Sequence, residues 1–299
     1  MAAMGWVLRK QCRHPRLSVS RASRLAVLRV SAAGRRHADE WVRALLQTSA
    51  RPELKPRVAL AGALANACLM QAFAEQLAGL KEKLLTMASH AESSVYKVIE
   101  ALGKRDYDLA QRIEADDTAI DRFEVAVDEL AIQLLGQAPR DSDLRLITVA
   151  MKISQNLERV GDETTTIARR VQELCQDAPL KLALDLPQMA TLAAQMLKHA
   201  LDAFVNQDPA AARALIPQDK GVDLLNKRNH QQLADQMIKD PNSVTRCLSL
   251  MVISKSLERI ADHAKNVAEE VVYLCEARDI RHTGAQEPAP AAAASVTLP

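Results

Sequence analysis

Residues 151–169 read MKISQNLERVGDETTTIAR, and residues 251–269 read MVISKSLERIADHAKNVAE. The two stretches lie 100 residues apart, and eight of their 19 positions are identical. A second match lies upstream at an offset of 102, where Asp117-x-x-Ile-Asp121 corresponds to Asp219-x-x-Val-Asp223. Self-similarity over this length is the signature of a repeated structural unit. The sequence therefore predicts two tandem copies of one fold.

Composition and spacing predict that this fold is helical. Aromatic residues make up 3% of the 299 residues and glycine occurs nine times, whereas strands favour aromatics and nucleotide-binding folds need glycine-rich loops. Between residues 73 and 277 apolar residues recur at helical spacing, interrupted by five short breaks. The predicted helices cover residues 72–103, 107–136, 141–176, 187–206, 209–239 and 242–277. We therefore expect an all-α protein made of two tandem three-helix bundles.

The same breaks divide the chain into four parts. These are a basic head over residues 1–69, repeat one over 70–180, repeat two over 181–281 and a low-complexity tail over 282–299. Residues 1–60 contain 13 Lys and Arg and three acidic residues. We expect the head to be disordered or to reflect a misassigned start, with Met70 as the candidate start. The tail is expected to be disordered.

The head also admits a targeting interpretation. Its Arg- and Ser-rich composition, with no acid before Asp39, is that of a mitochondrial transit peptide. The uncharged run from Val58 to Ala74 is too short and too rich in alanine for a membrane helix. The N-terminal residue of the native protein would separate an organellar interaction protein from a cytoplasmic one.

Charge and cysteine content favour a cytoplasmic protein without nucleic-acid partners. Residues 61–299 carry a net charge of −8, which argues against binding to a phosphate backbone. Five cysteines occur without a Cys-x-x-Cys pair. This pattern predicts free, mostly buried thiols in a reducing compartment.

The duplicated helix combines an apolar stripe with an acidic face. The stripe of the first copy has heptad spacing, which predicts a core position, and it consists of Ile153, Leu157, Val160, Ile167, Val171 and Leu174. Glu158 points about 100° away from this stripe, and Asp162 shares its face four residues later. Glu258 and Asp262 repeat the pattern. Like charges at this spacing repel, so a neighbouring cation or a metal ion should compensate them.

The preceding helix of each copy adds further carboxylates. If the two helices are antiparallel neighbours, Asp117 and Asp121 converge on the first acidic pair, and Asp219 and Asp223 converge on the second. Oxygen ligands favour magnesium, calcium, manganese or iron. A solvated helix face with surface ion pairs through Arg159 and Arg259 is the simpler alternative. His263 has no counterpart in repeat one, and we interpret it as incidental.

Catalytic signatures are missing from the sequence. It contains no Walker loop, nucleophile elbow, dinucleotide fingerprint or zincin motif, and no Glu-x-x-His of the kind found in di-iron bundles. We therefore expect a protein that is not an enzyme. Turnover after metal loading would revive the alternative of a metal-dependent carboxylate-bundle enzyme. No phosphate cradle is evident, so tight phosphate binding is not expected.

Five stretches of the chain resemble the PhoU family, which regulates phosphate uptake in bacteria. They are Phe73-Ala-Glu-Gln-Leu, Leu84-Leu85-x-Met87, Asp117-x-x-Ile-Asp121, Leu157-Glu-Arg-Val-Gly-Asp162 and the segment from Ser256 to Glu269. The resemblance spans roughly residues 73–280. It implies a cytoplasmic, dimeric, negative regulator of the phosphate-starvation response. Such a protein links the phosphate ABC transporter to a sensor histidine kinase.

Some members of the family bind iron or other metal clusters through E/D-x-x-x-D motifs. The resemblance therefore implies metal binding by Glu158, Asp162, Glu258 and Asp262, beside the four aspartates of the preceding helices. Asn266 extends the motif in repeat two, whereas repeat one has Thr166 at that place. This difference predicts that the first metal site is the weaker of the two.

Overall fold

The computed structural model describes residues 55–116 and 118–281, and every element assigned within these ranges is helical. The longer helices are α4 (Lys55–Lys104), α6 (Thr118–Leu135), α7 (Asp141–Cys175), α8 (Leu186–Asn206), α10 (Asp219–Lys239) and α11 (Val244–Glu276). Short elements lie between them, namely α5 (Tyr107–Asp116), α9 (Pro209–Leu215), η2 (Ile216–Gln218) and η3 (Pro241–Ser243). The all-α prediction is confirmed.

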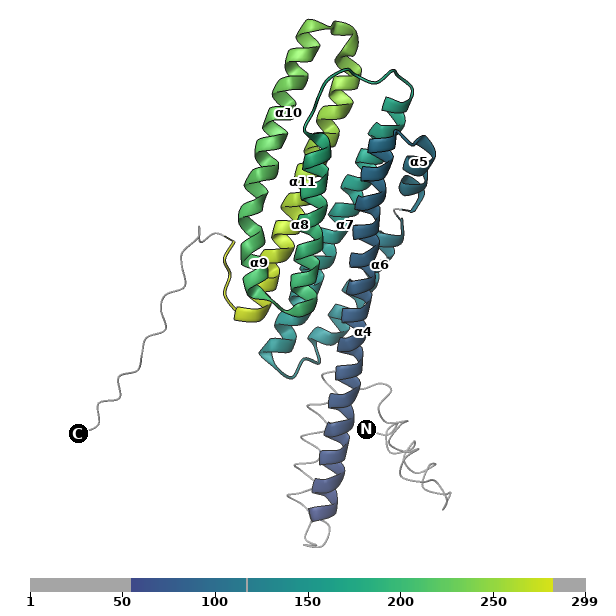
Figure 1. Ribbon diagram of the computed structural model, residues 1–299. Helices are drawn as coiled ribbons and strands as arrows, with labels where there is room; N and C mark the ends of the chain where they lie inside the picture. The colour runs from purple at the N-terminus through teal and green to yellow at the C-terminus, as the bar shows by residue number, and fades with distance from the viewer. Residues whose placement is uncertain (1–54, 117, 282–299) are drawn as a thin grey trace, which may run out of the picture. The chain divides into compact units, whose positions relative to one another are not determined.

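The described residues belong to two compact units. One unit contains residues 55–79 and 132–139, and the other contains residues 80–131 and 140–281. The second unit holds both acidic faces, so the description below concerns that unit. Within it, α8, α10 and α11 pack against one another (Figure 1). In the other copy, the ring centroids of His90 on α4 and Phe123 on α6 lie 5.4 Å apart. Arg169 of α7 forms an ion pair with Glu114 of α5.

The first helix is longer than the sequence pattern predicts. It begins at Lys55 rather than near residue 72, so residues 55–69 of the expected head are helical. The Ala-rich segment from Val58 to Ala74 has high helix propensity, which explains this extension. Nothing in the described part of the chain forms a helix with the length and apolar content needed to cross a bilayer. The remainder of the head and the predicted tail lie outside the described residues.

The predicted helix 209–239 is interrupted in the structure, whereas the predicted helix 107–136 is described on both sides of Asp117, which lies outside the described residues. The expected helix 107–136 consists of α5 and α6, and the expected helix 209–239 consists of α9, η2 and α10. In the second case Pro217 lies inside η2, where its missing N–H and its ring oppose a continuous α-helix.

The turns that precede α5 and α9 are duplicated. Arg105 and Gln207 both have left-handed backbone, with φ values of 53° and 51°. Asp208 caps α9 by accepting hydrogen bonds from Ala210 and Ala211, and Asp106 accepts one from the Leu109 N–H. The side-chain oxygens thereby satisfy helix N–H groups that lack intrahelical partners.

The cysteines at the ends of α7 and α11 bind these same turns. Cys175 donates from Sγ to the carbonyl oxygen of Arg105 at 3.1 Å, and Cys275 donates to that of Gln207 at 3.5 Å. The thiols described are free, as predicted, but only that of Cys247 is fully buried. The expectation of mostly buried thiols is therefore wrong for Cys68, Cys175 and Cys275. Cys12 lies outside the described residues.

The apolar stripes of α7 and α11 form the core of each copy. Leu157 and Leu257 are both fully buried, as are the flanking stripe positions, except Leu274, which is half-buried. The two helices also contact each other along their length. Lys152 of α7 pairs with Glu270 of α11, and Glu163 of α7 pairs with Arg259 of α11. Residue numbers therefore increase along α7 while those of their partners decrease along α11. The duplicated helices therefore run antiparallel.

Candidate functional site

The acidic pair of repeat one lies on α7, within electrostatic range of Glu124 on α6. Glu158 is 17% exposed at its side chain and Asp162 46%. Arg159 lies between them, with Nε 3.3 Å from Oε2 of Glu158 and Nη1 3.1 Å from Oδ2 of Asp162. Burial, together with the negative charges of Asp162 and Glu124, raises the pKa of Glu158 to about 7 against the opposing effect of Arg159.

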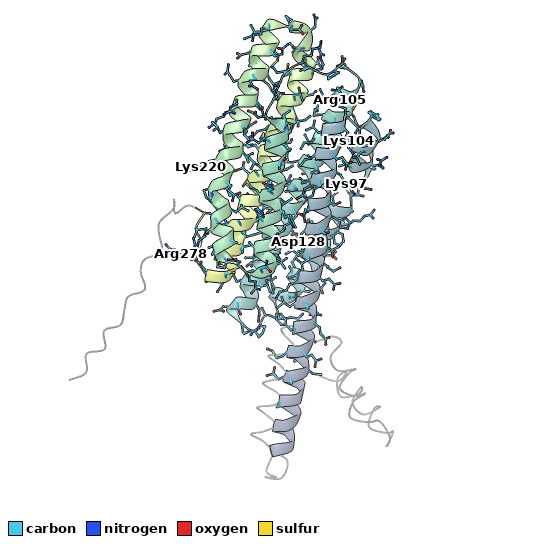
Figure 2. All side chains as sticks on the ribbon, in the orientation of Figure 1. Lys97, Lys104, Arg105, Asp128, Lys220 and Arg278 are labelled. Atoms are coloured by element: carbon cyan, nitrogen blue, oxygen red, sulfur yellow. The ribbon has the colours of Figure 1, made fainter. Side chains whose placement is uncertain are left out.

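Glu124 of α6 raises the pKa of Glu158 through its negative charge. The alignment of the two repeats did not identify this residue. Burial, followed by the charge of Asp128, raises the pKa of Glu124, while Arg159 lowers it. Asp121 is exposed, and its charge makes a smaller contribution to the raised pKa of Glu124. Asp117 lies outside the described residues. Figure 2 labels Asp128 on α6.

A spacing signal for Glu124 was present in the sequence. Asp121, Glu124 and Asp128 are separated by three and four residues, which places them on one helix face. The duplication concealed this signal, because position 124 corresponds to Asn226 in repeat two.

In repeat two the structure brings the four predicted carboxylates together. Glu258 and Asp262 lie on α11, and Asp219 and Asp223 lie on α10. Burial, together with the negative charges of Asp219, Glu258 and Asp223, raises the pKa of Asp262 to about 6. The charge of Lys265 opposes this shift. Asp219 and Glu258 are buried.

Lysine side chains accompany these acids. Lys265 donates from Nζ to Oδ2 of Asp219 at 2.8 Å, and Lys255 forms an ion pair with Glu258. The other oxygen of Asp219, Oδ1, is buried and has no hydrogen-bond partner. Asn266 is exposed and donates from Nδ2 to Oδ1 of Asn156 on α7 at 3.3 Å.

The donor chemistry of both clusters suits a hard cation. All the side chains concerned carry carboxylate oxygens, and Oδ1 of Asp219 is an orphaned buried acceptor. In residues 55–116 and 118–281, no group of three or more His, Cys, Asp or Glu side chains already stands at metal-binding spacing. A metal ion would therefore require these carboxylates to change rotamer.

The contact between α7 and α11 contains a row of polar bridges. Arg259 donates from Nη1 to Oε1 of Glu163 at 3.0 Å, and Nδ1 of His263 lies 3.0 Å from Oδ1 of Asn156. Burial lowers the pKa of His263. His263 therefore makes a structural contact between the two copies, and its interpretation as incidental to any binding site stays a prediction.

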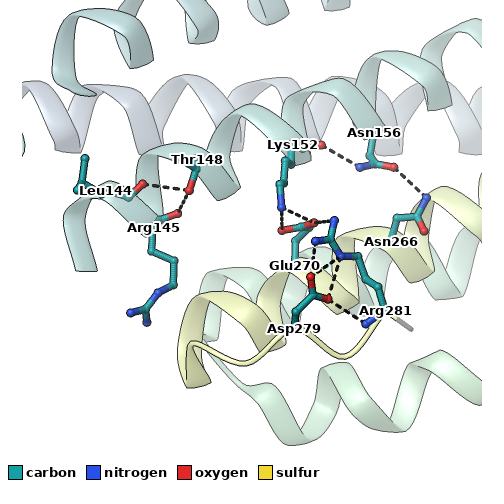
Figure 3. Close-up of polar contacts among 9 residues, drawn as sticks. All are labelled: Leu144, Arg145, Thr148, Lys152, Asn156, Asn266, Glu270, Asp279 and Arg281. Atoms are coloured by element: carbon teal, nitrogen blue, oxygen red, sulfur yellow. Dashed lines mark hydrogen bonds and ion pairs between the residues drawn. The ribbon is translucent and has the colours of Figure 1, made fainter. Parts of the chain in front are cut away.

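The row continues toward the end of α11. Figure 3 shows Nζ of Lys152 held by both carboxylate oxygens of Glu270 at 3.1 Å. Arg281 binds the same carboxylate at 3.3 Å and also pairs with Asp279. Two cations thus compensate Glu270, whose side chain is 6% exposed.

An apolar pocket of about 530 Å³ lies where the segment between the repeats passes over the ends of α4 and α7. Its lining is mostly aliphatic, with Arg105 and Arg246 as the charged residues. Arg105, labelled in Figure 2, donates to the carbonyl oxygens of Leu174 and Asp177. Arg246 donates to that of Ala178 at 2.9 Å. Both arginines therefore stabilise the segment between the repeats through hydrogen bonds to its backbone carbonyl oxygens.

These features define a class of protein: a duplicated three-helix bundle whose copies join through one antiparallel helix pair, each copy with an acidic face. The PhoU domain matches the chain twice, over residues 84–171 and 186–271. The chain belongs to the PhoU family.

Relatives and solved structures agree with this assignment. The chain is 36% identical over 218 residues to a phosphate-specific transport system accessory protein PhoU homolog of Pseudomonas putida, covering 72% of this chain and 85% of the relative. It is 31% identical over 216 residues to the phosphate-specific transport system accessory protein PhoU of Escherichia coli K12, covering 72% and 90%.

Two crystal structures have the same fold. PhoU from Pseudomonas aeruginosa superposes with a TM-score of 0.67 at 34% identity, covering 69% of this chain and all of that one. The phosphate transport system regulatory protein PhoU from Streptococcus pneumoniae gives a TM-score of 0.64 at 28% identity, covering 70% and 99%.

Proposed function

We propose that this protein is a negative regulator of phosphate uptake and of the phosphate-starvation response. Membership of the PhoU family is the observation that carries the proposal, because the relatives are named as accessory or regulatory proteins of phosphate transport.

Phosphate uptake tests this role. Uptake of radiolabelled phosphate would be measured in phosphate-rich medium, in cells of the source organism with and without this gene. The regulator should hold uptake down, so the deletion strain should take up phosphate faster and the restored gene should reverse this. Equal uptake in all strains would contradict the proposal.

The finer mechanism that we propose is an adaptor between the phosphate ABC transporter and a sensor histidine kinase in the cytoplasm. Two copies of one bundle give one chain two related surfaces, which supports simultaneous contact with two partners. Copurification from cells would test this. Transporter subunit and kinase should both accompany the tagged protein, and a tagged protein that retains neither would contradict the adaptor.

We also propose that the protein acts as a homodimer. Val244, Leu248 and Val252 form an apolar stripe on α11, spaced at one helix turn, and are 36%, 51% and 36% exposed. An apolar stripe of this kind favours contact with another protein surface. Sedimentation should give twice the chain mass, and replacement of Leu248 by Lys should shift the species toward the monomer. A monomeric wild-type protein would exclude the homodimer.

The acidic faces are proposed to bind iron or another divalent or trivalent metal ion. The donor chemistry and the orphaned oxygen of Asp219 support this. Elemental analysis of the purified protein would be compared with the E158A/D162A and E258A/D262A variants. At least one variant should lose metal, and equal metal content in all three proteins would refute metal binding at these faces.

A further inference from the structure

The segment that joins the two repeats forms one wall of the pocket of about 530 Å³. Leu180, Leu182 and Leu184 line the pocket, whereas Lys181 and Ala183 between them are exposed to solvent. This alternation is that of an extended chain, in which successive side chains point to opposite sides. The three leucines therefore form one continuous apolar wall.

Hydrogen bonds hold this segment at both ends. At its start, Arg246 donates to the carbonyl oxygen of Ala178 at 2.9 Å. At its end, the N–H of Asp185 donates to Oδ1 of Asn229 at 2.9 Å, and the Asp185 carboxylate pairs with Arg228. Asn229 is fully buried. The leucine wall is therefore in place before any ligand binds, which lowers the ordering cost of binding.

The other walls of the pocket come from helix ends in both repeats. Ile99 and Leu102 of α4 and Val171 of α7 belong to repeat one, and Ala190 of α8 and Leu250 of α11 belong to repeat two. Among the described residues that line the pocket, none is aromatic and none is acidic. Its volume lies within the range of small-molecule sites, which is roughly 300–1,000 Å³. The lining therefore suits an aliphatic ligand.

Arg105 and Arg246 are the charged residues of this lining, and no described carboxylate neutralises them. Their described hydrogen bonds all go to backbone carbonyl oxygens, from Nη2 of Arg105 and from Nη1 and Nη2 of Arg246. A guanidinium carries more N–H donors than these bonds use. Beside an apolar lining a positive charge is screened less than in bulk water, which favours a bound anion.

The backbone of the turn does not require an arginine at position 105. At the offset of 102 between the repeats, Arg105 corresponds to Gln207. Gln207 has the same left-handed conformation, with a φ of 51° against 53° for Arg105, and carries no charge. The positive charge at this turn is therefore a feature of repeat one alone.

We propose that this pocket binds a small carboxylate with a single aliphatic chain. The chain would lie against Leu182 and the apolar helix ends, and the carboxylate would accept hydrogen bonds from Arg105 and Arg246. The planar fork of a guanidinium matches the geometry of a carboxylate. The site shares no residue with the acidic clusters and does not rest on the proposed regulatory function.

Calorimetric titration of the full-length protein with decanoate, below its micelle-forming concentration, tests the proposal. Decanol has the same chain without a charge, and decyltrimethylammonium has the opposite charge. R105Q/R246Q removes both cations, and R278Q is the control because Arg278 is exposed and does not line the pocket. L182E places an acid in the leucine wall, and A183E is the matched control at the neighbouring exposed position. Circular dichroism would verify the helical fold of each variant.

We expect saturable binding of decanoate to the wild type. R105Q/R246Q and L182E should each weaken it by about tenfold or more, because they remove charge-assisted hydrogen bonds or add a repelling charge. R278Q and A183E should change it by less than about twofold. Decanol should bind more weakly than decanoate to the wild type, and R105Q/R246Q should leave decanol binding unchanged. Equal weakening of decanol and decanoate in R105Q/R246Q would show that the arginines only support the segment, which would refute their role in binding the carboxylate.

Other results would also overturn the inference. A wild type without saturable decanoate binding would refute the site, and unchanged binding in L182E would place the ligand outside the pocket. Equal or tighter binding of decyltrimethylammonium would refute the preference for an anion. Displacement of decanoate by equimolar inorganic phosphate would refute the need for an aliphatic chain. If R105Q/R246Q fails to fold, the comparison of decanoate with decyltrimethylammonium and that of L182E with A183E decide the matter.

Discussion

Arg259 of α11 donates from Nη1 to Oε1 of Glu163 on α7 at 3.0 Å, and this ion pair joins the two copies of the duplicated helix. The duplication would place a matching pair between Arg159 and His263. Instead, Arg159 binds Asp162 within α7, and His263 lies beside Asn156. The two copies therefore share a backbone arrangement but differ in their polar contacts.

The Arg259–Glu163 pair should contribute modestly to stability. Arg259 is 55% exposed and Glu163 is 12% exposed at the side chain, so solvent screens much of the attraction. A double-mutant cycle with R259Q and E163Q should give a coupling of about 0.5–1 kcal/mol in urea unfolding. The local pair of Arg170 and Glu173 is the control, with a coupling of about 0.3–0.5 kcal/mol. A coupling of zero for Arg259–Glu163 would contradict its bridging role.

The apolar stripes should be equally important in the two copies. Leu157 and Leu257 are both fully buried at corresponding positions. Replacement of either by Ala removes buried methyl groups and leaves a cavity, so each should lower the free energy of unfolding by about 2–5 kcal/mol. Leu224 is 59% exposed, and its replacement by Ala should cost less than about 0.5 kcal/mol. A large loss for one leucine and none for the other would contradict a duplicated core.

The raised pKa of Glu158 predicts a pH dependence of stability. Its pKa rises from 4.5 to about 7, so the folded protein holds the proton more tightly than the unfolded chain. This contribution to stability is fully present below pH 4.5 and is lost as the pH rises through 7. E158Q keeps a neutral side chain, so it should be more stable than wild type at pH 8 and similar to it at pH 4. The urea midpoint at the two pH values measures this.

Glu114 is a control with the opposite sign. Its hydrogen bonds from Arg169 and Gln172 lower its pKa below 4.5. Stability from this residue is present above pH 4.5 and is lost as the pH falls further. E114Q should therefore be less stable than wild type at pH 8, with the difference shrinking in acid. The same direction of change in E158Q and E114Q would show that the Glu158 environment is not as described.

Direct phosphate binding should be weak. The clusters of the described helices are acidic and repel an anion, and the sequence contains no glycine-rich phosphate loop. Calorimetric titration of the full-length protein with inorganic phosphate should show no binding in the micromolar range. Saturable binding at micromolar phosphate would mean that the protein itself senses phosphate.

The repeated sequence was sufficient to predict the architecture, because heptad stripes such as that around Leu157 specify a buried helix face in both copies. Element ends were less predictable. The Ala-rich segment after Lys55 has helix propensity but no strong periodicity, so the early start of α4 could not be inferred from the stripe pattern. The break at Pro217 was not predicted, because the spacing of apolar residues does not show where a helix is interrupted by a short turn.

The acidic clusters were only partly predictable. Glu158 and Asp162 follow from helical spacing, but Glu124 was missed because its counterpart Asn226 is not acidic. The partners of Lys265 and His263 depend on how α10 and α7 pack against α11, and spacing within one helix carries no information on that. Contacts between elements therefore required the structure.

Alkaline phosphatase activity in phosphate-rich medium tests the central claim most directly. It would be measured in cells of the source organism with the gene intact, deleted and restored. A negative regulator of the phosphate response should keep the activity low in the intact and restored strains, and the deletion strain should show high activity. Equally low activity in all three strains would contradict the regulatory role proposed for this protein.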